Sequence, residues 1–578
     1  MGDKLTVADF FCGAGGFSEG FRQAGFDIVF AVDNWEPARQ THSLNHPNAK
    51  HPGLDCDHLT KGDVLLMTPE YVLYDMPDVD VIIGSPPCIS FSSSNRAGKA
   101  DKSLGVVLIE KYLQIIALKK YKPNPKVHLK YWLMENVPNS KEHVKDKYTF
   151  KMLGLTNDIL KNLNIHKKET EVALEIDLDD TIFNAVHYGV PQNRLRFICG
   201  HYPKPAKTTS EKDKWVKLGY IIDGLKSGQK KIKDPNYEAI IIEEKDLTDH
   251  YYDTIIPPFE WQEAKIKKQQ ARYYGRMSFP EDPLRPSRTI MATRSVLSRE
   301  SMILPNGSPD NFRSPTVREV ASIMSFPITY QFQANNEASK YRLVGNAVCS
   351  KMAFEFAKEI LKKENKRLIH KYESSADVSK LSADLRKKNP PKKMPRDKHP
   401  RANFAEIVPD LKYHNFRVEL DNNMPRMNGN RILWSASIHH ATGIDSMKKS
   451  VPNTNRILLL LNSYSDKKVV EAYITSVKHE FNNKIPIAKE FQSQHCKVKI
   501  DHRFSTPRSA LQSVKSLVDK HFPEEKYEMI VLNNIHRKKQ IIKFNHGKLP
   551  DDNIPLRVVA ALYACNYIAK LTRGKTHG

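Results

Sequence analysis

Short apolar segments alternate with longer amphipathic stretches through the first 200 residues of the chain. The apolar segments are KLTVADFF, DIVFAVD, VDVIIGS, KYWLMENV and LRFICGH. One intervening stretch, SLGVVLIEKYLQIIALKKY, spaces its apolar residues as a helix does. Buried strands that alternate with helices predict an α/β fold with a mainly parallel sheet, covered by helices on both faces. In such a sheet the reactive residues are expected at the carboxyl ends of the strands.

The pattern changes after residue 200, which suggests further domains. Residues 201–312 are rich in Lys, Tyr, Pro and short polar runs, and helical patterns return in 313–370. Residues 371–402 contain the basic, proline-broken run RKKNPPKKMPRDKHPR, which predicts a linker. Residues 403–578 combine strand-like runs (RILLLLNSY, YEMIVLNNI) with helix-like ones (KKVVEAYITSVKHEF, PLRVVAALYACNYIAKL). We therefore expect an α/β domain at 1–200, a smaller middle domain, a return to the first domain, a linker and a C-terminal α/β domain.

Positive charge is concentrated in the C-terminal part of the chain. Residues 1–350 hold 46 Lys and Arg against 43 Asp and Glu, whereas residues 351–578 hold 44 against 23. Such an excess favours a polyanionic partner such as nucleic acid, although a solvated surface is the simpler alternative. No apolar run reaches the ~18–20 residues that span a bilayer. The N-terminus, MGDKLTVADFF, lacks the features of a signal peptide, so we expect an intracellular protein without membrane partners.

The seven cysteines are scattered without a CxxC pair, which argues against a zinc ribbon and a disulfide framework. One of them, Cys88, lies in GSPPCISFS, where two prolines stiffen the backbone before it. A lone cysteine is most often a small buried residue. Here, however, Glu135 follows another apolar strand, and Gln192, Arg194 and Arg196 alternate in VPQNRLRFI and so share one face. The alternatives are a helix cap for the glutamate and a surface ion pair for the arginines.

A glycine-rich turn follows the first apolar strand in DFFCGAGGFSEGF. Glycines at 13, 15 and 16 let the backbone approach a ligand at a helix N-terminus. Polar or aromatic residues that could hold such a ligand stand further along the chain: Asp33, Asn34, Trp35 and Asp63. Together they indicate a nucleoside-cofactor site. The absence of a GKS or GKT phosphate cradle argues against a nucleoside triphosphate.

Eight motifs, in order, resemble those of the cytosine-5 DNA methyltransferase family across residues 5–360. They are DFFCGAGGF, VDNW, GD, SPPC, ENV, QNRLR, RSPTVREVASIMSFP and GNAV. The resemblance implies a Rossmann-like methyltransferase sheet and a target-recognition domain at residues 201–312. It also implies an enzyme that transfers a methyl group from S-adenosyl-L-methionine to carbon 5 of cytosine in a specific double-stranded DNA sequence.

The resemblance assigns catalytic roles to four residues. Cys88 is the implied nucleophile, which adds to carbon 6 of the base and makes carbon 5 reactive. A free thiol has a pKa of roughly 8.5, so positive charge from Arg194 and Arg196 would favour its thiolate. Arg194 is also expected to contact the base carbonyl, and Glu135 to engage ring N3 and the exocyclic amine. The cytosine must flip out of the duplex, at a cost of a few kcal/mol.

The resemblance also implies a set of cofactor residues and no metal. Phe11 and Trp35 are expected against the adenine, with Asp63 reading its amino group. Leu104 is expected to line the pocket and Asn346 to close it. The glycine-rich turn would surround the methionine part. The full cofactor set is Phe11, Gly13, Gly15, Gly16, Asp33, Asn34, Trp35, Asp63, Leu104 and Asn346.

Three positions depart from the family pattern. The family usually has glutamine after the cysteine, whereas this chain has Ile89. The acidic residue that commonly binds the ribose just before the tryptophan is Asn34 here, so either Asp33 or Asn34 must serve. The Arg and Leu that follow the catalytic loop in the family correspond to Lys102 and Leu104.

Basic and aromatic residues of the middle domain are candidates for phosphate and base contacts, although each alone is also an ordinary surface residue. They are Lys265, Lys267, Lys268, Arg272, Tyr273, Tyr274 and Arg276. His439 and His440, in SIHHATG, have no carboxylate at a suitable spacing in the sequence, which favours a structural role.

The leading hypothesis is a monomeric cytoplasmic DNA (cytosine-5)-methyltransferase that acts at the nucleoid. It would work alone or in a restriction–modification system with a cognate endonuclease. Three alternatives stay open: a methyltransferase fused to a DNA-binding or nuclease domain, an RNA cytosine-5 methyltransferase, and an inactive DNA-binding paralogue.

Overall fold

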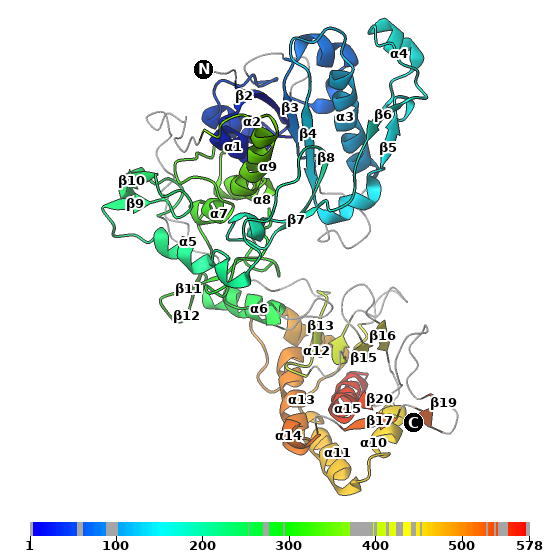
Figure 1. Ribbon diagram of the computed structural model, residues 1–578. Helices are drawn as coiled ribbons and strands as arrows, with labels where there is room; N and C mark the ends of the chain where they lie inside the picture. The colour runs from blue at the N-terminus through cyan, green and yellow to red at the C-terminus, as the bar shows by residue number, and fades with distance from the viewer. Residues whose placement is uncertain are drawn as a thin grey trace. The chain divides into compact units, whose positions relative to one another are not determined.

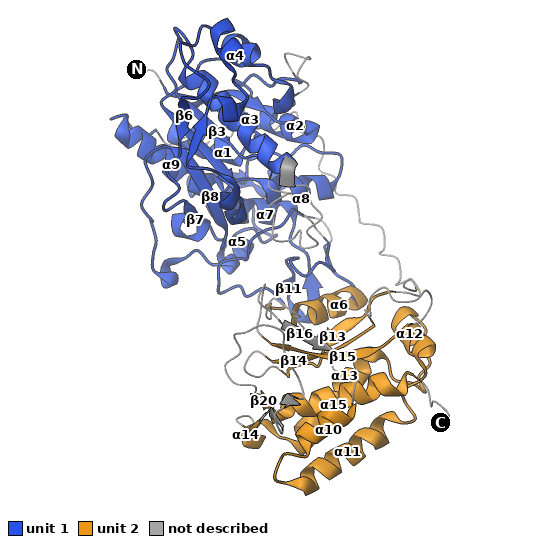
Figure 2. Cartoon of the chain, turned by 90° about the vertical axis from the view of Figure 1, so that its right-hand side faces the viewer, with its two compact units in different colours: residues 1–257, 280–390 blue, residues 258–279, 391–578 orange. Residues whose placement is uncertain are grey.

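The computed structural model divides into two compact units (Figure 2). Residues 1–257 and 280–390 form the first unit, and residues 258–279 and 391–578 form the second. The structure describes residues 4–54, 62–87, 102–251, 254–269, 277–292, 295–369, 397, 402–411, 416–422, 432–440, 447–450, 454–527, 530–533, 535–536, 539–540 and 553–573. Within these ranges no helix is long and apolar enough to cross a membrane.

A six-stranded sheet in the order β2-β1-β3-β4-β8-β7 forms the centre of the first unit (Figure 1). Its strands are β1 (Thr6–Phe10), β2 (Asp27–Val32), β3 (Val81–Gly84), β4 (Tyr131–Asn136), β7 (Ile182–Asn184) and β8 (Leu195–His201). β1 pairs in parallel with β2 and β3, and β3 pairs in parallel with β4. β8 runs antiparallel to both β4 and β7. The predicted α/β class with a mainly parallel sheet is confirmed, and each of the five predicted strands forms.

Helices cover both faces of this sheet because alternate side chains of each strand enter opposite apolar clusters. Val7, Ile83 and Leu133 belong to the cluster that includes α1 (Gly16–Ala24) and α9 (Ser350–Lys363). Ala8 and Ile82 belong to the cluster formed with α3 (Lys102–Lys120). Figure 1 shows α3 on one side of the sheet and α1 with α9 on the other.

The ends of two of these helices follow from their sequences. α1 begins after Gly15 and ends at Gly25, both with left-handed backbones that favour glycine. α7 (Val317–Ile323) begins with a capping box, in which Thr316 and Glu319 each satisfy the other's backbone N–H. The other described helices and hairpins of the first unit are α2 (Glu36–Asn45), α4 (Asn157–Asn162), α5 (Leu218–Gly224), α8 (Glu337–Asn346), β5 (Lys147–Thr149) with β6 (Val172–Glu175), β9 (Lys231–Lys233) with β10 (Ile241–Glu243), and β11 (Leu304–Asn306) with β12 (Ser308–Arg313).

The second unit has an antiparallel sheet in the order β13-β14-β15-β16. Its strands are β13 (Ala405–Ile407), β14 (Arg417–Asp421), β15 (Ser435–His440) and β16 (Met447–Ser450). The buried helix α15 (Leu556–Leu571) packs on β14 and β15. The remaining elements are α6 (Pro258–Gln269), α10 (Thr454–Leu461), α11 (Lys467–Phe481), α12 (Ala488–Cys496), α13 (Pro507–His521), α14 (Glu524–Tyr527), β17 (Val531–Asn533) with β20 (Asn553–Pro555), and β18 (Ile535–His536) with β19 (Lys539–Gln540).

The strand predicted at RILLLLNSY is wrong, because this run forms most of α10. Its leucines have a high helix propensity, and Ile457, Leu460 and Leu461 are buried with α15 in one apolar cluster. The helices predicted at residues 467–481 and 555–571 form as α11 and α15.

The sequence also missed a carboxylate partner for His439. Arg417, Glu419 and His439 are all about 1% exposed, and they lie on one face of β14 and β15. Because β14 and β15 are antiparallel neighbours, the Glu419 carboxylate comes within 3.6 Å of His439 Nε2. This contact joins residues 20 positions apart, so spacing along the chain could not reveal it.

The close packing of α1 on α9 gives the first prediction, the substitution Gly20→Ala. A Cβ at residue 20 would lie 2.5 Å from both the Ala353 Cβ and the Ser350 carbonyl oxygen, so the helices must separate. Overpacking of this kind costs about 1–3 kcal/mol in the free energy of unfolding. Chemical denaturation checks the loss, with the exposed Lys363→Ala of α9 as a control expected within about 0.5 kcal/mol of the parent chain. An unchanged midpoint for Gly20→Ala would contradict the packing described here.

Candidate active site

The carboxyl ends of four parallel strands bring the predicted motifs to one edge of the sheet. Phe10 and Met134 are both register partners of Gly84, on the two sides of β3. Phe11 and Glu135 therefore follow on strands that are separated only by β3, about 10 Å apart at strand spacing. The cofactor motif after β1 and the ENV motif at the end of β4 thus flank Ser85–Pro87, the described residues that follow β3.

The glycine-rich turn has an unusual backbone. Phe11, Gly13 and Gly15 have φ of 54°, 53° and 85°, in the left-handed region. A Cβ on Gly13 would meet no atom within 4 Å, so there is open space over this residue. A Cβ on Gly16, in contrast, would lie 2.0 Å from the Val348 carbonyl oxygen, so this glycine is needed for close packing. The turn is therefore tightly packed at Gly16 and open to a ligand at Gly13.

Asp33 braces the turn. Its carboxylate accepts hydrogen bonds from the backbone N–H of Gly13 at 3.0 Å and of Trp35 at 2.8 Å, one to each oxygen. Burial raises the pKa of Asp33 above its ordinary value, although these two N–H groups and Arg39 act in the opposite direction. Arg39 also donates to the Asp33 carbonyl oxygen at 2.7 Å. Of the two ribose candidates, Asp33 therefore has both carboxylate oxygens engaged, and Asn34 is exposed.

The other predicted cofactor residues occupy the same edge or the helices next to it. The Arg342 guanidinium of α8 lies 4.6 Å from the ring centre of Trp35, so one cation–π partner of this ring is in place. The Asp63 carboxylate accepts from the Leu65 backbone N–H at 3.0 Å. Leu104 is 53% exposed on α3, and Asn346 is exposed at the last residue of α8. Among the described residues, neither Leu104 nor Asn346 forms a hydrogen bond or ion pair with the glycine-rich turn.

The ENV motif connects two parts of the predicted catalytic set. Glu135 accepts from Arg196 Nε at 2.8 Å, and both side chains are largely buried. Asn136 donates from Nδ2 to the Pro86 carbonyl oxygen at 3.1 Å. This bond ties the end of β4 to the loop that carries Cys88 two residues later. Cys88 itself lies outside the described residues, as does Ile89.

Of the three predicted catalytic residues that the structure describes, Arg194 is the most enclosed, at 2% exposure. It donates to the carbonyl oxygens of Ile290, Gly345 and Ala347 at 3.0–3.1 Å, and so it ties three distant segments together. Burial raises the pKa of the Cys349 thiol to about 11, and the positive charges of Arg194 and Arg196 act against this rise. The three side chains therefore lie close to one another. The predicted alternation is confirmed, because residues 192, 194 and 196 are buried while 193 and 195 are exposed.

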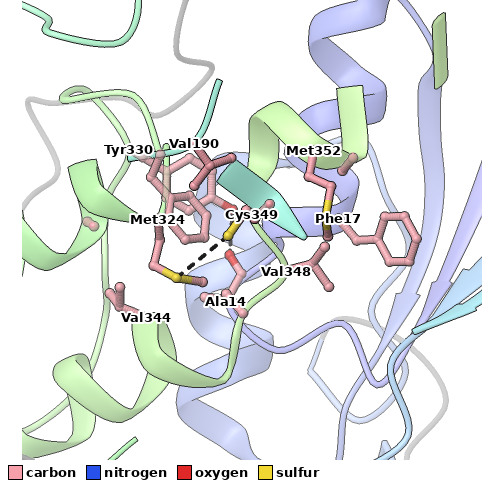
Figure 3. Packing of buried hydrophobic residues seen from close by; sticks show 14 of the residues in the cluster. Ala14, Phe17, Val190, Met324, Tyr330, Val344, Val348, Cys349 and Met352 are labelled. Carbon is pink, nitrogen blue, oxygen red and sulfur yellow. Dashed lines mark hydrogen bonds between the residues drawn. The ribbon is translucent and has the colours of Figure 1, made fainter. Parts of the chain in front are cut away.

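An apolar cluster supports the turn from behind (Figure 3). Tyr330 donates from its hydroxyl to the Ala14 carbonyl oxygen at 2.5 Å. The Cys349 thiol contacts the Met324 sulfur at 3.8 Å, and Figure 3 shows both sulfurs beside Ala14 and Val348. Sequence reasoning missed Tyr330 because it lies more than 300 residues from the turn and belongs to none of the motifs used.

The predicted DNA-contacting residues are only partly described. Lys265 is exposed on α6, Lys267 pairs with Glu263 at 2.9 Å, and Lys268 is fully buried. Because Lys268 is buried, the structure contradicts the predicted contact between this residue and a DNA phosphate. The four candidates from Arg272 to Arg276 lie outside the described residues. In the described ranges no cluster of His, Cys, Asp and Glu has the arrangement of a metal site.

Known proteins resemble slightly less than two thirds of this chain. The sequence profile of the family "C-5 cytosine-specific DNA methylase" matches residues 5–362. The type II methyltransferase M.MthTI of Methanothermobacter thermautotrophicus is 30% identical over 377 residues, which cover 62% of this chain and 98% of that protein. M.NgoPII of Neisseria gonorrhoeae, also a type II methyltransferase, is 26% identical over 382 residues, 62% of this chain and 96% of its own.

Among solved structures, the S. pombe Dnmt2 methyltransferase has 17% identity and a TM-score of 0.39, and the match covers 63% of this chain and 100% of that one. The family profile covers more than half of the present chain, and its match includes every predicted catalytic and cofactor residue. The chain therefore belongs to the C-5 cytosine-specific DNA methylase family and is a DNA (cytosine-5)-methyltransferase.

Proposed function

We propose that this chain transfers a methyl group from S-adenosyl-L-methionine to carbon 5 of a cytosine that is flipped out of double-stranded DNA, through a covalent adduct with Cys88. The observation that supports this most is the sheet edge itself. An open glycine turn follows β1, the Arg196–Glu135 pair stands at the end of β4, and Ser85–Pro87, which precede Cys88 in the sequence, follow β3 between them.

The described residues fit such a cofactor. The open space over Gly13 leaves room for a ligand against the backbone, and Trp35 offers a flat aromatic surface. Asn34, exposed beside that surface, is our candidate for the ribose hydroxyls, because Asp33 uses both carboxylate oxygens to hold Gly13 and Trp35. Bound there, S-adenosyl-L-methionine would supply an electrophilic methyl group.

The remaining chemistry belongs to the chain's own side chains. Cys88 would add to carbon 6 as a thiolate, and Glu135 would hold ring N3 while negative charge develops on the base. Arg196 donates to one Glu135 oxygen and thereby orients the carboxylate, which leaves the other oxygen for the base. Arg194 would keep the pocket closed by its bonds to Gly345 and Ala347.

The type II relatives suggest the biological setting. We propose that the chain protects a specific DNA sequence in a restriction–modification system, with a cognate endonuclease as its partner. Target recognition is assigned to residues 201–312, although residues 258–279 belong to the second compact unit. The basic C-terminal region is expected to add salt-dependent DNA affinity.

Cys88→Ala tests the nucleophile. Because the variant cannot form the covalent bond, methyl transfer to DNA should fall to background while DNA binding persists, and trapping on 5-fluorocytosine DNA should be lost. Cys496→Ala removes a thiol from the second unit and should trap normally. Methyl transfer that survives in Cys88→Ala would refute the assignment.

Glu135→Gln tests the carboxylate. The amide keeps the shape but loses the charge that Arg196 orients, so single-turnover methyl transfer should slow by roughly 10²- to 10⁴-fold at unchanged DNA affinity. The matched control is Glu364→Gln, which alters a carboxylate paired with Lys130 and Tyr131 at the opposite end of β4. A rate for Glu135→Gln within threefold of that control would count against the role.

Asn34→Ala tests the choice between the two ribose candidates. It should weaken S-adenosylmethionine binding by roughly three- to tenfold, the value of about one hydrogen bond, without loss of stability. Asp33→Ala should instead lower the melting temperature, because two backbone N–H groups lose their acceptor. Calorimetric binding and thermal unfolding distinguish the two, and a stability loss confined to Asn34→Ala would reverse our assignment.

A further inference from the structure

A continuous chain of buried hydrogen bonds lies behind the glycine-rich turn. Ser18 Oγ lies 2.6 Å from Asp9 Oδ2, and His42 Nε2 lies 3.0 Å from Ser18 Oγ. His42 Nδ1 in turn lies 2.9 Å from His51 Nε2. All four side chains are at most 1% exposed, and they come from β1, α1, α2 and the segment after α2. The chain therefore links the three elements that frame the turn.

The three hydrogen bonds can be donated in either of two directions along this set of side chains. With Asp9 ionised, Ser18 donates to the carboxylate, His42 donates from Nε2 to Ser18, and His51 donates from Nε2 to His42. With Asp9 protonated, every bond reverses: Asp9 donates to Ser18, Ser18 to His42 Nε2, and His42 Nδ1 to His51. Both directions keep three hydrogen bonds and neutral histidines, and they differ by one proton on Asp9.

The surroundings place that proton near neutral pH. Burial raises the pKa of Asp9 to about 7, against the lowering effect of the Ser18 hydrogen bond, and Asp33 adds to the rise. Burial lowers the pKa values of His42 and His46 well below their ordinary range, so both stay neutral. The other ionisable groups that interact with Asp9 are Cys12, Tyr112 and Tyr330, and burial raises the pKa of each of them.

Glu19, next to Ser18 in α1, forms its contacts with residues outside this set of hydrogen-bonded side chains. Arg22 donates to both Glu19 oxygens at 2.8 Å, and His46 Nε2 lies 3.9 Å from one of them. Among Asp9, His42 and His46, the side chain whose charge changes near neutral pH is therefore Asp9. The carboxylate of Asp9 lies in β1, two residues before Phe11.

We propose that the hydrogen-bonded set Asp9–Ser18–His42–His51 is a proton-responsive support of the glycine-rich turn that raises the affinity for a cationic methyl donor relative to that for its neutral product. S-adenosylmethionine carries a sulfonium charge that S-adenosylhomocysteine lacks, while both carry the same amino and carboxylate groups. A negative charge behind the turn attracts the first ligand and not the second. Protonation of Asp9 removes this distinction without breaking the chain.

This inference rests on the proposed cofactor, and calorimetric affinities of the full-length protein for both ligands test it. A carboxyl group with a pKa of about 7 gains its proton as the pH falls through 7, so its charge is present at pH 8 and largely lost at pH 6. The preference for S-adenosylmethionine over S-adenosylhomocysteine should therefore shrink by about three- to tenfold from pH 8 to pH 6. By linkage, S-adenosylmethionine binding at pH 7 should release protons, whereas S-adenosylhomocysteine binding should not.

Two variants and a control sharpen the test. Asp9→Asn can donate to Ser18 as the protonated acid does, so it should show the low preference at every pH. Ser18→Ala removes the bond that lowers the Asp9 pKa, so the transition should move to higher pH. Asp27→Asn removes an exposed carboxylate at the start of β2 and should behave as the parent chain.

The outcomes separate the two claims. If neither ligand binds, the proposed cofactor is wrong. If both bind and their affinity ratio is equal at pH 6 and pH 8, or if Asp9→Asn keeps the parent's pH dependence, the proton-responsive support is refuted while the proposed function stands.

Discussion

The parallel pairing of β1 with β2 and β3, and of β3 with β4, decides where the predicted site residues of this protein lie. Parallel strands end at a common edge, so the motif after each strand meets the motifs after its neighbours. The Asp33 carboxylate uses this neighbourhood directly, since it reaches from the end of β2 to the Gly13 N–H after β1. A shift of one residue in either pairing would separate these groups and turn every side chain of the strand to the other face.

The proposed site has two halves as a result of this arrangement. The half after β1 and β2 is open at Gly13 and tightly packed at Gly16, which suits a ligand that contacts the backbone of the turn. The half at the end of β4 carries the Glu135–Arg196 ion pair, whose charges are largely buried and therefore strongly oriented. Ser85–Pro87 follow β3 between them, and the bond from Asn136 to the Pro86 carbonyl connects these residues to the second half.

Much of the first unit could be predicted because its signals are local. Each buried strand is a short β-branched or aromatic run, and each motif follows one strand directly. What the sequence could not supply were contacts between distant segments. The bonds of Arg194 to Gly345 and Ala347, the support of Ala14 by Tyr330, and the Glu419–His439 pair all depend on how strands and helices pack.

In the second unit, too, packing between distant segments decided features that the sequence alone did not predict. RILLLLNSY forms a helix because its leucines pack with α15, and a short apolar run alone does not distinguish strand from helix. Lys268 is likewise buried although its neighbours in sequence are polar. For the ribose, the sequence left two candidates open, and only the hydrogen bonds of Asp33 favour Asn34.

The most direct measurement of the central claim is the mapping of methyl groups that the full chain transfers from labelled S-adenosylmethionine to nucleic acid. The account predicts label on carbon 5 of cytosine at one recurring sequence of double-stranded DNA, visible as protection in bisulfite sequencing. Label on transfer RNA with none on DNA, or on a ring position other than carbon 5, would contradict it.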